Sequence, residues 1–271
     1  MPYTHRYCLK SRFMKKEERL NYILEILKLT YISSVQELSQ KLNVSHMTIR
    51  RDLEELTSQN QIRMRHGSVL LNPDSVPGGN DTPYSLITAE SVHIEEKRRI
   101  GRLAASLIRP QETLIIDYGS TAEYLAKSLP PEVPLTILTY SLNVVAGLVG
   151  NDNYQLIFTG GLFHKNTLSF ESPEGLEMIR NFRANTAFVT ASGIDSRFGV
   201  TCSNYYERPT KRALMQSSRR KILMADSSKF GQIRSDYFAD LEEFDEIISD
   251  QGLSEEYREI IRGMGISLRL A

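Results

Sequence analysis

The stretch VSHMTIRRDLEEL at residues 44–56 decides how the first part of this chain folds. Ser45 can accept a hydrogen bond from a free amide at the start of a helix, which is the usual place of a serine N-cap. Ile49, Leu53 and Leu56 then recur at helical spacing. The stretch therefore predicts a helix that begins after Ser45 and buries one apolar stripe.

The opposite face of this helix is polar and basic, with His46, Thr48, Arg50 and Arg51. A helix held by its apolar stripe can offer N-terminal side chains to base edges, while arginines and the positive helix end meet phosphates. The stretch thus predicts a DNA recognition helix. The alternative is an ordinary surface helix with two solvated arginines.

The residues upstream favour the recognition helix. Leu20, Ile23, Leu24 and Leu27 mark one helix, and Ser34 with Glu37 forms a capping-box start for a second. The second helix carries Val35, Leu38 and Leu42. Only Asn43 and Val44 separate it from Ser45, which is typical of a helix-turn-helix.

Residues 62–70, IRMRHGSVL, alternate apolar and basic residues around His66-Gly67 and predict a hairpin that forms a wing. Arg63 and Arg65 share one face of it and suit the DNA backbone or minor groove, although alternating charge is also usual on any solvated strand. The predicted DNA-binding residues are Ser34, Ser45, His46, Met47, Thr48, Arg50, Arg51, Arg63 and Arg65.

Residues 34–56, above all Val44-Ser45 followed by TIRRDL at residues 48–53, resemble the DeoR family of bacterial transcriptional regulators. That family usually shows Gly-Gly-Ala after the wing, where this chain has His66-Gly67-Ser68. The resemblance implies a winged helix-turn-helix that represses or activates genes of sugar metabolism under the control of a sugar phosphate.

Length and charge indicate two domains. The chain has 271 residues, 41% of them apolar, which suffices for two separate cores. Residues 1–73 hold 12 Lys+Arg and 7 Asp+Glu, a net charge of +5. Residues 74–271 hold 21 Lys+Arg and 26 Asp+Glu, a net charge of −5, so the whole chain has no net charge. A basic module joined to an acidic body fits a head that binds a polyanion, though such an imbalance alone is weak evidence.

Other features set the domain limits and the compartment. Residues 1–13 are expected to be a disordered arm, or else Met14 is the true start; 14–71 form the winged domain, 72–86 a Pro- and Gly-rich linker, and 87–271 the sensing and oligomerisation domain. Cys8 and Cys202 have no Cys or His companions at metal-ligand spacing. The longest apolar run, around residues 142–149, is too short for a membrane span. We expect a cytoplasmic protein with no metal or cofactor.

Beyond the linker, a helix at residues 95–108 leads to an alternation of strands and helices. Strands are predicted at residues 113–116, 135–138, 155–158, 187–190, 221–225 and 246–248, with a helix at 122–129. This order predicts an α/β fold, a Rossmann-like, mainly parallel sheet with helices on both faces. Such sheets bind ligands at the carboxyl ends of their strands.

Four segments are therefore site candidates. Residues 117–121, DYGST, suit a phosphate through a close backbone approach, hydroxyl donors and a helix N-terminus, but equally a plain capped turn. Residues 159–161, TGG, are explained as well by a flexible turn. Glu207 and Lys211 are by default a surface ion pair. Residues 226–231, DSSKFG, contain a lysine that is ordinarily just solvated.

Taken together, these segments resemble the DeoR sensor domain over residues 95–250, with Lys97, Ile100 and residues 193–195, GID, also in its pattern. The resemblance implies a sugar-phosphate isomerase fold adapted as a sensor. It places the phosphate on residues 119–121, with Lys229 as a second cation. The effector-binding residues predicted in this way are Asp117, Gly119, Ser120, Thr121, Tyr140, Ser141, Gly160, Gly161, Asp195, Glu207, Lys211 and Lys229.

Within that set, Asp117, Asp195, Glu207 and Lys211 are expected to face the sugar hydroxyls. Tyr140 stands where the family usually has Asn, so the choice of ligand can differ.

The resulting hypothesis is a transcriptional regulator that binds double-stranded DNA and a phosphorylated sugar, as a homodimer or homotetramer. One alternative is an isomerase-like enzyme, in which Asp195 or Glu207 near Lys211 shuttles a proton. Against it, residues 192–195, SGID, replace the Asp-Gly-Ala-Asp of such isomerases. The other alternative is a winged module that binds protein, against which the basic recognition face counts.

Overall fold

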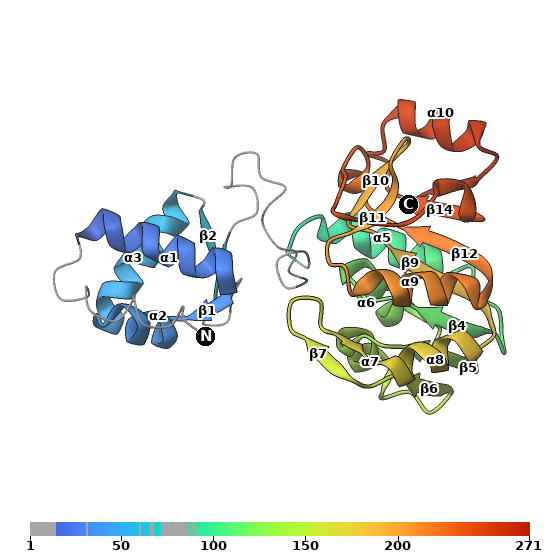
Figure 1. The fold of residues 1–271 in the computed structure, drawn as a ribbon, viewed down its shortest axis with the longest axis horizontal. Coiled ribbons are helices and arrows are strands. Elements are labelled where there is room, and N and C mark those ends of the chain that lie inside the picture. The colour runs from blue at the N-terminus through green and yellow to red at the C-terminus, as the bar shows by residue number, and fades with distance from the viewer. Residues whose placement is uncertain are drawn as a thin grey trace. The chain divides into compact units, whose positions relative to one another are not determined.

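The computed structural model describes residues 15–30, 32–59, 61–65, 68–71, 86, 89 and 91–271. The chain divides into two compact units, residues 1–88 and 89–271, which are considered separately below (Figure 1). The predicted arm at residues 1–13 and the predicted linker up to residue 85 lie outside the described residues.

The first unit contains three helices and a small sheet: α1 (Lys16–Thr30), β1 (Ile32–Ser34), α2 (Val35–Leu42), α3 (His46–Ser58), β2 (Ile62–Arg65) and β3 (Ser68–Leu71). β2 and β3 pair antiparallel, so the predicted hairpin is confirmed. β1, which the sequence did not predict, pairs with the other edge of β3. Apolar residues from all three helices and from β2 and β3 form one core, including Ile23, Leu38 and Leu53.

Local side-chain bonds set where the second and third helices begin. Ser34 and Glu37 make the predicted capping box at the start of α2. Ser45 Oγ accepts the amide of Thr48 at 3.2 Å and caps α3, also as predicted. Between them Asn43 takes a left-handed conformation at φ 50°, which Asn tolerates better than most residues, and so turns the chain tightly.

The second unit is built on a seven-stranded sheet whose neighbouring strands are all parallel. The strands are β4 (Thr113–Ile116), β5 (Leu135–Thr139), β6 (Tyr154–Phe158), β9 (Ala184–Thr190), β12 (Ser218–Met224), β14 (Glu246–Ser249) and β15 (Ser267–Leu270). Their order is β15-β14-β12-β9-β4-β5-β6. Six of them were predicted. β15 was missed because it is a short edge strand without a buried apolar run.

Helices cover both faces of this sheet, as predicted (Figure 1). α5 (Ile94–Ala105), α6 (Ser120–Ser128) and α7 (Leu142–Leu148) share one core cluster with alternate residues of the central strands. α8 (Pro173–Asn181) packs on α9 (Glu207–Gln216), which contacts β9 and β12, and α10 (Glu255–Gly263) contacts β15. Within residues 91–271 no helix has the length and apolar composition to cross a membrane.

Short elements lie in the segments that connect the strands of this sheet. β7 (Leu162–His164) and β8 (Ser169–Glu171) form a hairpin, and β10 (Gly193–Asp195), β11 (Gly199–Cys202) and β13 (Asp236–Ala239) form a second antiparallel sheet. Two 3-10 helices are η3 (Ser227–Lys229) and η4 (Leu241–Glu243). None of these elements was predicted.

The strand order reverses between β4 and β9. From β4 the chain adds β5 and β6 on one side, and it then crosses to place β9, β12, β14 and β15 on the other. The Asp117 amide, directly after β4, donates to Phe188 O of β9 at 3.0 Å. Ligands of open parallel sheets bind where the strand order reverses in this way, so the residues that follow β4 and β9 lie at the expected position of a site.

Gly101 tests the packing of α5 on α6. A Cβ atom at Gly101 would lie 2.6 Å from the backbone C of Tyr124 and 2.7 Å from the amide N of Leu125. Because backbone cannot move aside cheaply, Gly101→Ala should lower the free energy of unfolding by about 1–3 kcal/mol. Gly263→Ala is the control, since its Cβ would meet nothing within 4 Å. Equal stability of both variants in urea unfolding would show that α5 and α6 do not pack this closely.

Candidate effector site and DNA-binding face

A buried ion pair lies where the strand order reverses. Lys211 Nζ of α9 is 2.6 Å from Asp117 Oδ2, directly after β4, and both side chains are at most 1% exposed. Lys211 Nζ also donates to Thr190 O at the end of β9, at 2.9 Å. The Thr190 amide donates to the same Asp117 oxygen at 2.9 Å. One lysine and one carboxylate thereby join β4, β9 and α9.

Tyrosine hydroxyls extend this network. The Tyr140 hydroxyl, after β5, donates to Asp117 Oδ1, and the Tyr118 amide donates to the same oxygen at 2.9 Å. The Tyr118 hydroxyl donates to Glu207 Oε2, and Asn204 Nδ2 donates to Glu207 Oε1. The Lys211 ammonium also lies 4.6 Å from the centre of the Tyr118 ring, a cation–π distance. Each carboxylate oxygen of the network is therefore met by a donor.

Burial shifts the pKa values of two groups in this network, Glu207 and Tyr140. It raises the pKa of the Glu207 carboxyl above its ordinary value, while the Lys211 charge and the bonds from Tyr118 and Asn204 oppose that shift. Burial and the adjacent Asp117 charge together raise the pKa of the Tyr140 phenol well above its ordinary value. Tyr140 thus remains a hydrogen-bond donor at neutral pH.

Reading Glu207 and Lys211 as a surface ion pair is wrong. The two residues are 3% and 1% exposed, and the ion-pair partner of Lys211 is Asp117 rather than Glu207. Helical spacing places the two on one face of α9 but does not tell whether that face is buried. Sequence reasoning also missed Thr190, whose partner Asp117 is 73 positions away, and Asn204, which bonds Glu207 three residues further along the chain.

The loop after Asp117 joins a glycine of positive φ to the start of a helix. Gly119 has φ +130°, and a Cβ there would be 3.1 Å from Thr190 Oγ1. Ser120 and Thr121 begin α6, and their hydroxyls have no hydrogen-bond partner among the described residues. The first amides of a helix lack intrahelical acceptors and carry the positive end of its dipole. The predicted loop thus presents two hydroxyl donors without a partner among the described residues of the second unit.

The structure gives local roles to three other predicted residues and leaves a fourth, Gly160, open. Ser141 Oγ contacts Asn143 Oδ1 at the start of α7. A Cβ on Gly161 would lie 2.2 Å from Glu171 O, so that glycine is required by the turn, whereas Gly160 faces open space. Asp195 Oδ1 accepts the amides of Arg197 and Phe198, both at 2.9 Å, and closes the β10–β11 turn. Their predicted contact with an effector stays a prediction.

A second charged cluster stands at the end of β12. Lys97 Nζ donates to Ala89 O at 2.6 Å and Val92 O at 2.7 Å, and lies 4.0 Å from Asp226 Oδ2. Burial opposes ionisation of Asp226, but the Lys229 and Lys97 charges outweigh it and lower the pKa of Asp226 below its ordinary value. Lys229, the predicted second cation, thus stands beside a buried carboxylate.

On the first unit, α3 presents its predicted polar face to solvent. His46, Met47, Arg50 and Arg51 are exposed, Met47 by 58%. Ser45 and Thr48 lie with their hydroxyl oxygens 3.0 Å apart, so the predicted base contact of Thr48 competes with the helix cap. The side chains of Arg63 and Arg65 lie outside the described residues.

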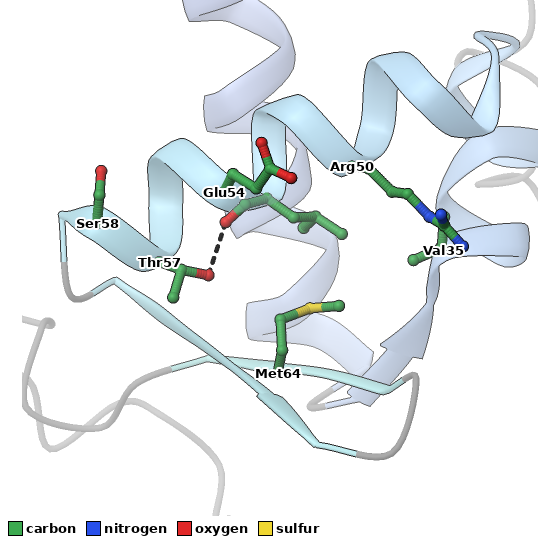
Figure 2. A pocket seen from close by; sticks show the side chains of 7 residues that line it. Val35, Arg50, Glu54, Thr57, Ser58 and Met64 are labelled. Carbon is green, nitrogen blue, oxygen red and sulfur yellow. Dashed lines mark hydrogen bonds between the residues drawn. The ribbon is translucent and has the colours of Figure 1, made fainter.

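Figure 2 shows Arg50, Glu54, Thr57 and Ser58 along α3, with Met64 of β2 facing them. These residues, with Val35 and Leu53, line an open groove of about 610 Å³ between the helix and the wing. Arg50 of α3 and Met64 of β2 thus line the same groove, with Arg50 next to Val35 (Figure 2).

An ion pair that the sequence did not predict positions α3. Arg19 of α1 binds Asp52 through Nε at 2.5 Å and through a second nitrogen at 2.9 Å, and Asp52 is 1% exposed. A bidentate pair of this kind fixes orientation as well as distance. The sequence does carry one sign of this pair. Asp52 comes three residues after Ile49, which places it on the buried stripe of α3.

A winged helix-turn-helix joined to a parallel α/β unit, with polar residues where the strand order reverses, is typical of a ligand-responsive DNA-binding regulator. Residues 19–74 match the DeoR-like helix-turn-helix domain, and residues 92–251 match the DeoR C-terminal sensor domain. The chain belongs to the DeoR family of transcriptional regulators, and not to the isomerase-like enzymes that were the alternative.

Two relatives from Escherichia coli strain K12 illustrate the similarity. The chain is 33% identical to the deoxyribose operon repressor over 243 residues, which cover 90% of this chain and 94% of the repressor. It is 36% identical to the glycerol-3-phosphate regulon repressor over 219 residues, 81% and 84% of the two chains. Ribose 5-phosphate isomerase A from Methanocaldococcus jannaschii aligns at 12% identity over 63% and 65% of the chains, with a TM-score of 0.38, too low for a functional argument.

The buried pair predicts a large loss of stability when one partner is removed. Lys211→Met should leave Asp117 charged and buried, and lower the free energy of unfolding by about 3–5 kcal/mol. The control is Lys127→Met, because Lys127 is 54% exposed and pairs with Glu123 on the surface of α6. That change should cost less than about 1 kcal/mol. Comparable midpoints for both variants in urea would mean that Lys211 does not neutralise Asp117.

Proposed function

We propose that this chain is a repressor of carbohydrate-metabolism genes whose second unit binds a phosphorylated sugar and thereby alters operator binding by its winged domain. The observation that carries the proposal is the loop at Gly119, Ser120 and Thr121, which offers unsatisfied donors at the reversal point of the sheet. Helix N-termini of this kind are ready-made phosphate sites.

In this proposal the buried network positions the residues around the ligand and does not itself bind the ligand. Asp117 already accepts four donors, so it cannot readily accept further bonds from a sugar. It fixes Thr190, whose hydroxyl donates to Tyr118 O at 2.6 Å and lies beside Gly119. The phosphate would lie on residues 119–121, with Lys229 as the second cation.

The winged domain would read an operator through α3. One chain supplies one recognition helix, and a palindromic operator requires two, so the proposal includes a homodimer or homotetramer. Two E. coli relatives are named as repressors of a deoxyribose operon and of a glycerol-3-phosphate regulon, which supports repression of genes for a related carbon source. The chain would then act at the bacterial nucleoid in the cytoplasm.

Arg50 and Arg51 test the DNA-binding face. Replacing both by Ala should weaken binding to all sequences, since contacts to phosphates carry no sequence information. The slope of log K against log salt should flatten by roughly 0.9 for each lost contact. Arg98→Ala in α5 of the second unit is the control, because Arg98 is exposed and pairs with exposed Glu95 on its own helix. If the double variant keeps its DNA affinity and its salt slope while α3 is still folded, these two arginines of α3 do not contact DNA.

Thr121 and Gly119 test the anion loop. Thr121→Ala should remove one donor to the phosphate and cost on the order of 1–3 kcal/mol of binding free energy. Gly119→Val should abolish binding, because a side chain there strains the backbone and crowds Thr190. Calorimetry with a panel of phosphorylated sugars measures both, and Thr136→Ala on β5 serves as control. Each variant should still bind the operator in the absence of effector. If both variants bind the effector with wild-type affinity, the loop is a capped turn and not the phosphate site.

A further inference from the structure

Helix α7 has no charged residue on any side. Residues 141–151 read SLNVVAGLVGN, and the helix buries Val144 and Leu148 against the sheet. Its outward side carries Leu142, Ala146 and Val149, spaced at four and three residues, with Leu142 42% and Val149 70% exposed. Surface helices usually carry charged or polar residues on the outward face, whereas a helix that is apolar all round is normally buried.

Aromatic residues continue this apolar surface beyond the start of α7. The Phe170 ring of β8 lies 5.1 Å from that of Phe158, at the end of edge strand β6, and 5.0 Å from that of Phe163 in β7. Phe158 and Phe163 are 38% and 40% exposed. The hairpin is tied to α7, because the Leu142 amide donates to Leu168 O at 2.8 Å. We call Leu142, Ala146, Val149, Phe158 and Phe163 the α7 patch.

We propose that the α7 patch is the surface through which two copies of this chain associate about a twofold axis. An interface of this symmetry sets the same patch against itself, so any charge on it near the axis would face its own copy. The α7 patch has no charge and so meets that requirement. This inference rests on the proposed function, in which two recognition helices read one operator.

The exposed area agrees with a specific dimer. If an aromatic side chain carries 150–250 Å² and an aliphatic one somewhat less, the five residues expose on the order of 300–400 Å² of apolar surface. A standard interface buries about 800 Å² per partner, of which about 60% is apolar. The α7 patch would thus supply most of the apolar area, and the polar rim of the hairpin and of α7 the remainder.

The test measures the mass of the full chain by sedimentation equilibrium, without DNA or effector. Ala146→Glu and Val149→Glu each place two carboxylates at the proposed interface, and each should raise the dissociation constant, fitted over a series of protein concentrations, by about tenfold or more. The control is Phe198→Glu, since Phe198 is 52% exposed between β10 and β11 and lies outside the α7 patch. Its mass should equal that of the unaltered chain.

Two results would overturn the inference: an unaltered chain that is monomeric, or an assembly that both Glu variants leave intact. Val149 follows the last residue of α7, so Val149→Glu changes no residue of the helix and decides the test if Ala146→Glu unfolds. A chain that binds operator and sugar phosphate as an oligomer, but whose oligomer survives both Glu changes, would reject this surface and leave the proposed function standing. If the Glu changes dissociate the dimer but the unaltered dimer binds no DNA, the proposed surface stands and the proposed function is rejected.

Discussion

The contact between Lys211 and Asp117 is the constraint on which the second unit depends. A buried carboxylate without a counter-charge costs several kcal/mol, and Asp117 is fully buried beside Lys211 at 2.6 Å. That pair fixes α9 against the ends of β4 and β9. Through Tyr118 and Glu207 the same network reaches the loop before α9. The loop at residues 119–121 therefore follows a carboxylate whose two oxygens are both met by donors.

The first unit also contains a buried carboxylate that is neutralised by a basic side chain. Asp52 lies within the apolar stripe of α3 and is satisfied by two bonds from Arg19 of α1. An apolar stripe alone would hold α3 in place but would tolerate small rotations about its axis. The bidentate pair opposes such rotation and so fixes the orientation of α3 relative to α1. In both units a buried ion pair positions the surface that meets a ligand.

Much of this architecture was predictable because its signals are local. The caps at Ser34 and Ser45, the buried stripe of α3 and six of the seven parallel strands all follow from periodicity and turn chemistry. The hairpin of β7 and β8 and the small sheet of β10, β11 and β13 were not predicted, since strands of three or four residues carry too few positions for a pattern. The site residues were grouped by family resemblance, and not by any spacing.

By itself, the sequence determined the order of two units, the recognition helix with its cap and basic face, and the strand ends at which polar residues collect. These depend on interactions within about ten residues. The tertiary structure alone decided that Lys211 pairs with Asp117 rather than with Glu207, that Asp52 meets Arg19, and that α7 turns an apolar side outward. The reason is physical: burial and pairing across distant segments depend on which faces the fold brings together, and helical spacing is the same for a buried face and an exposed one.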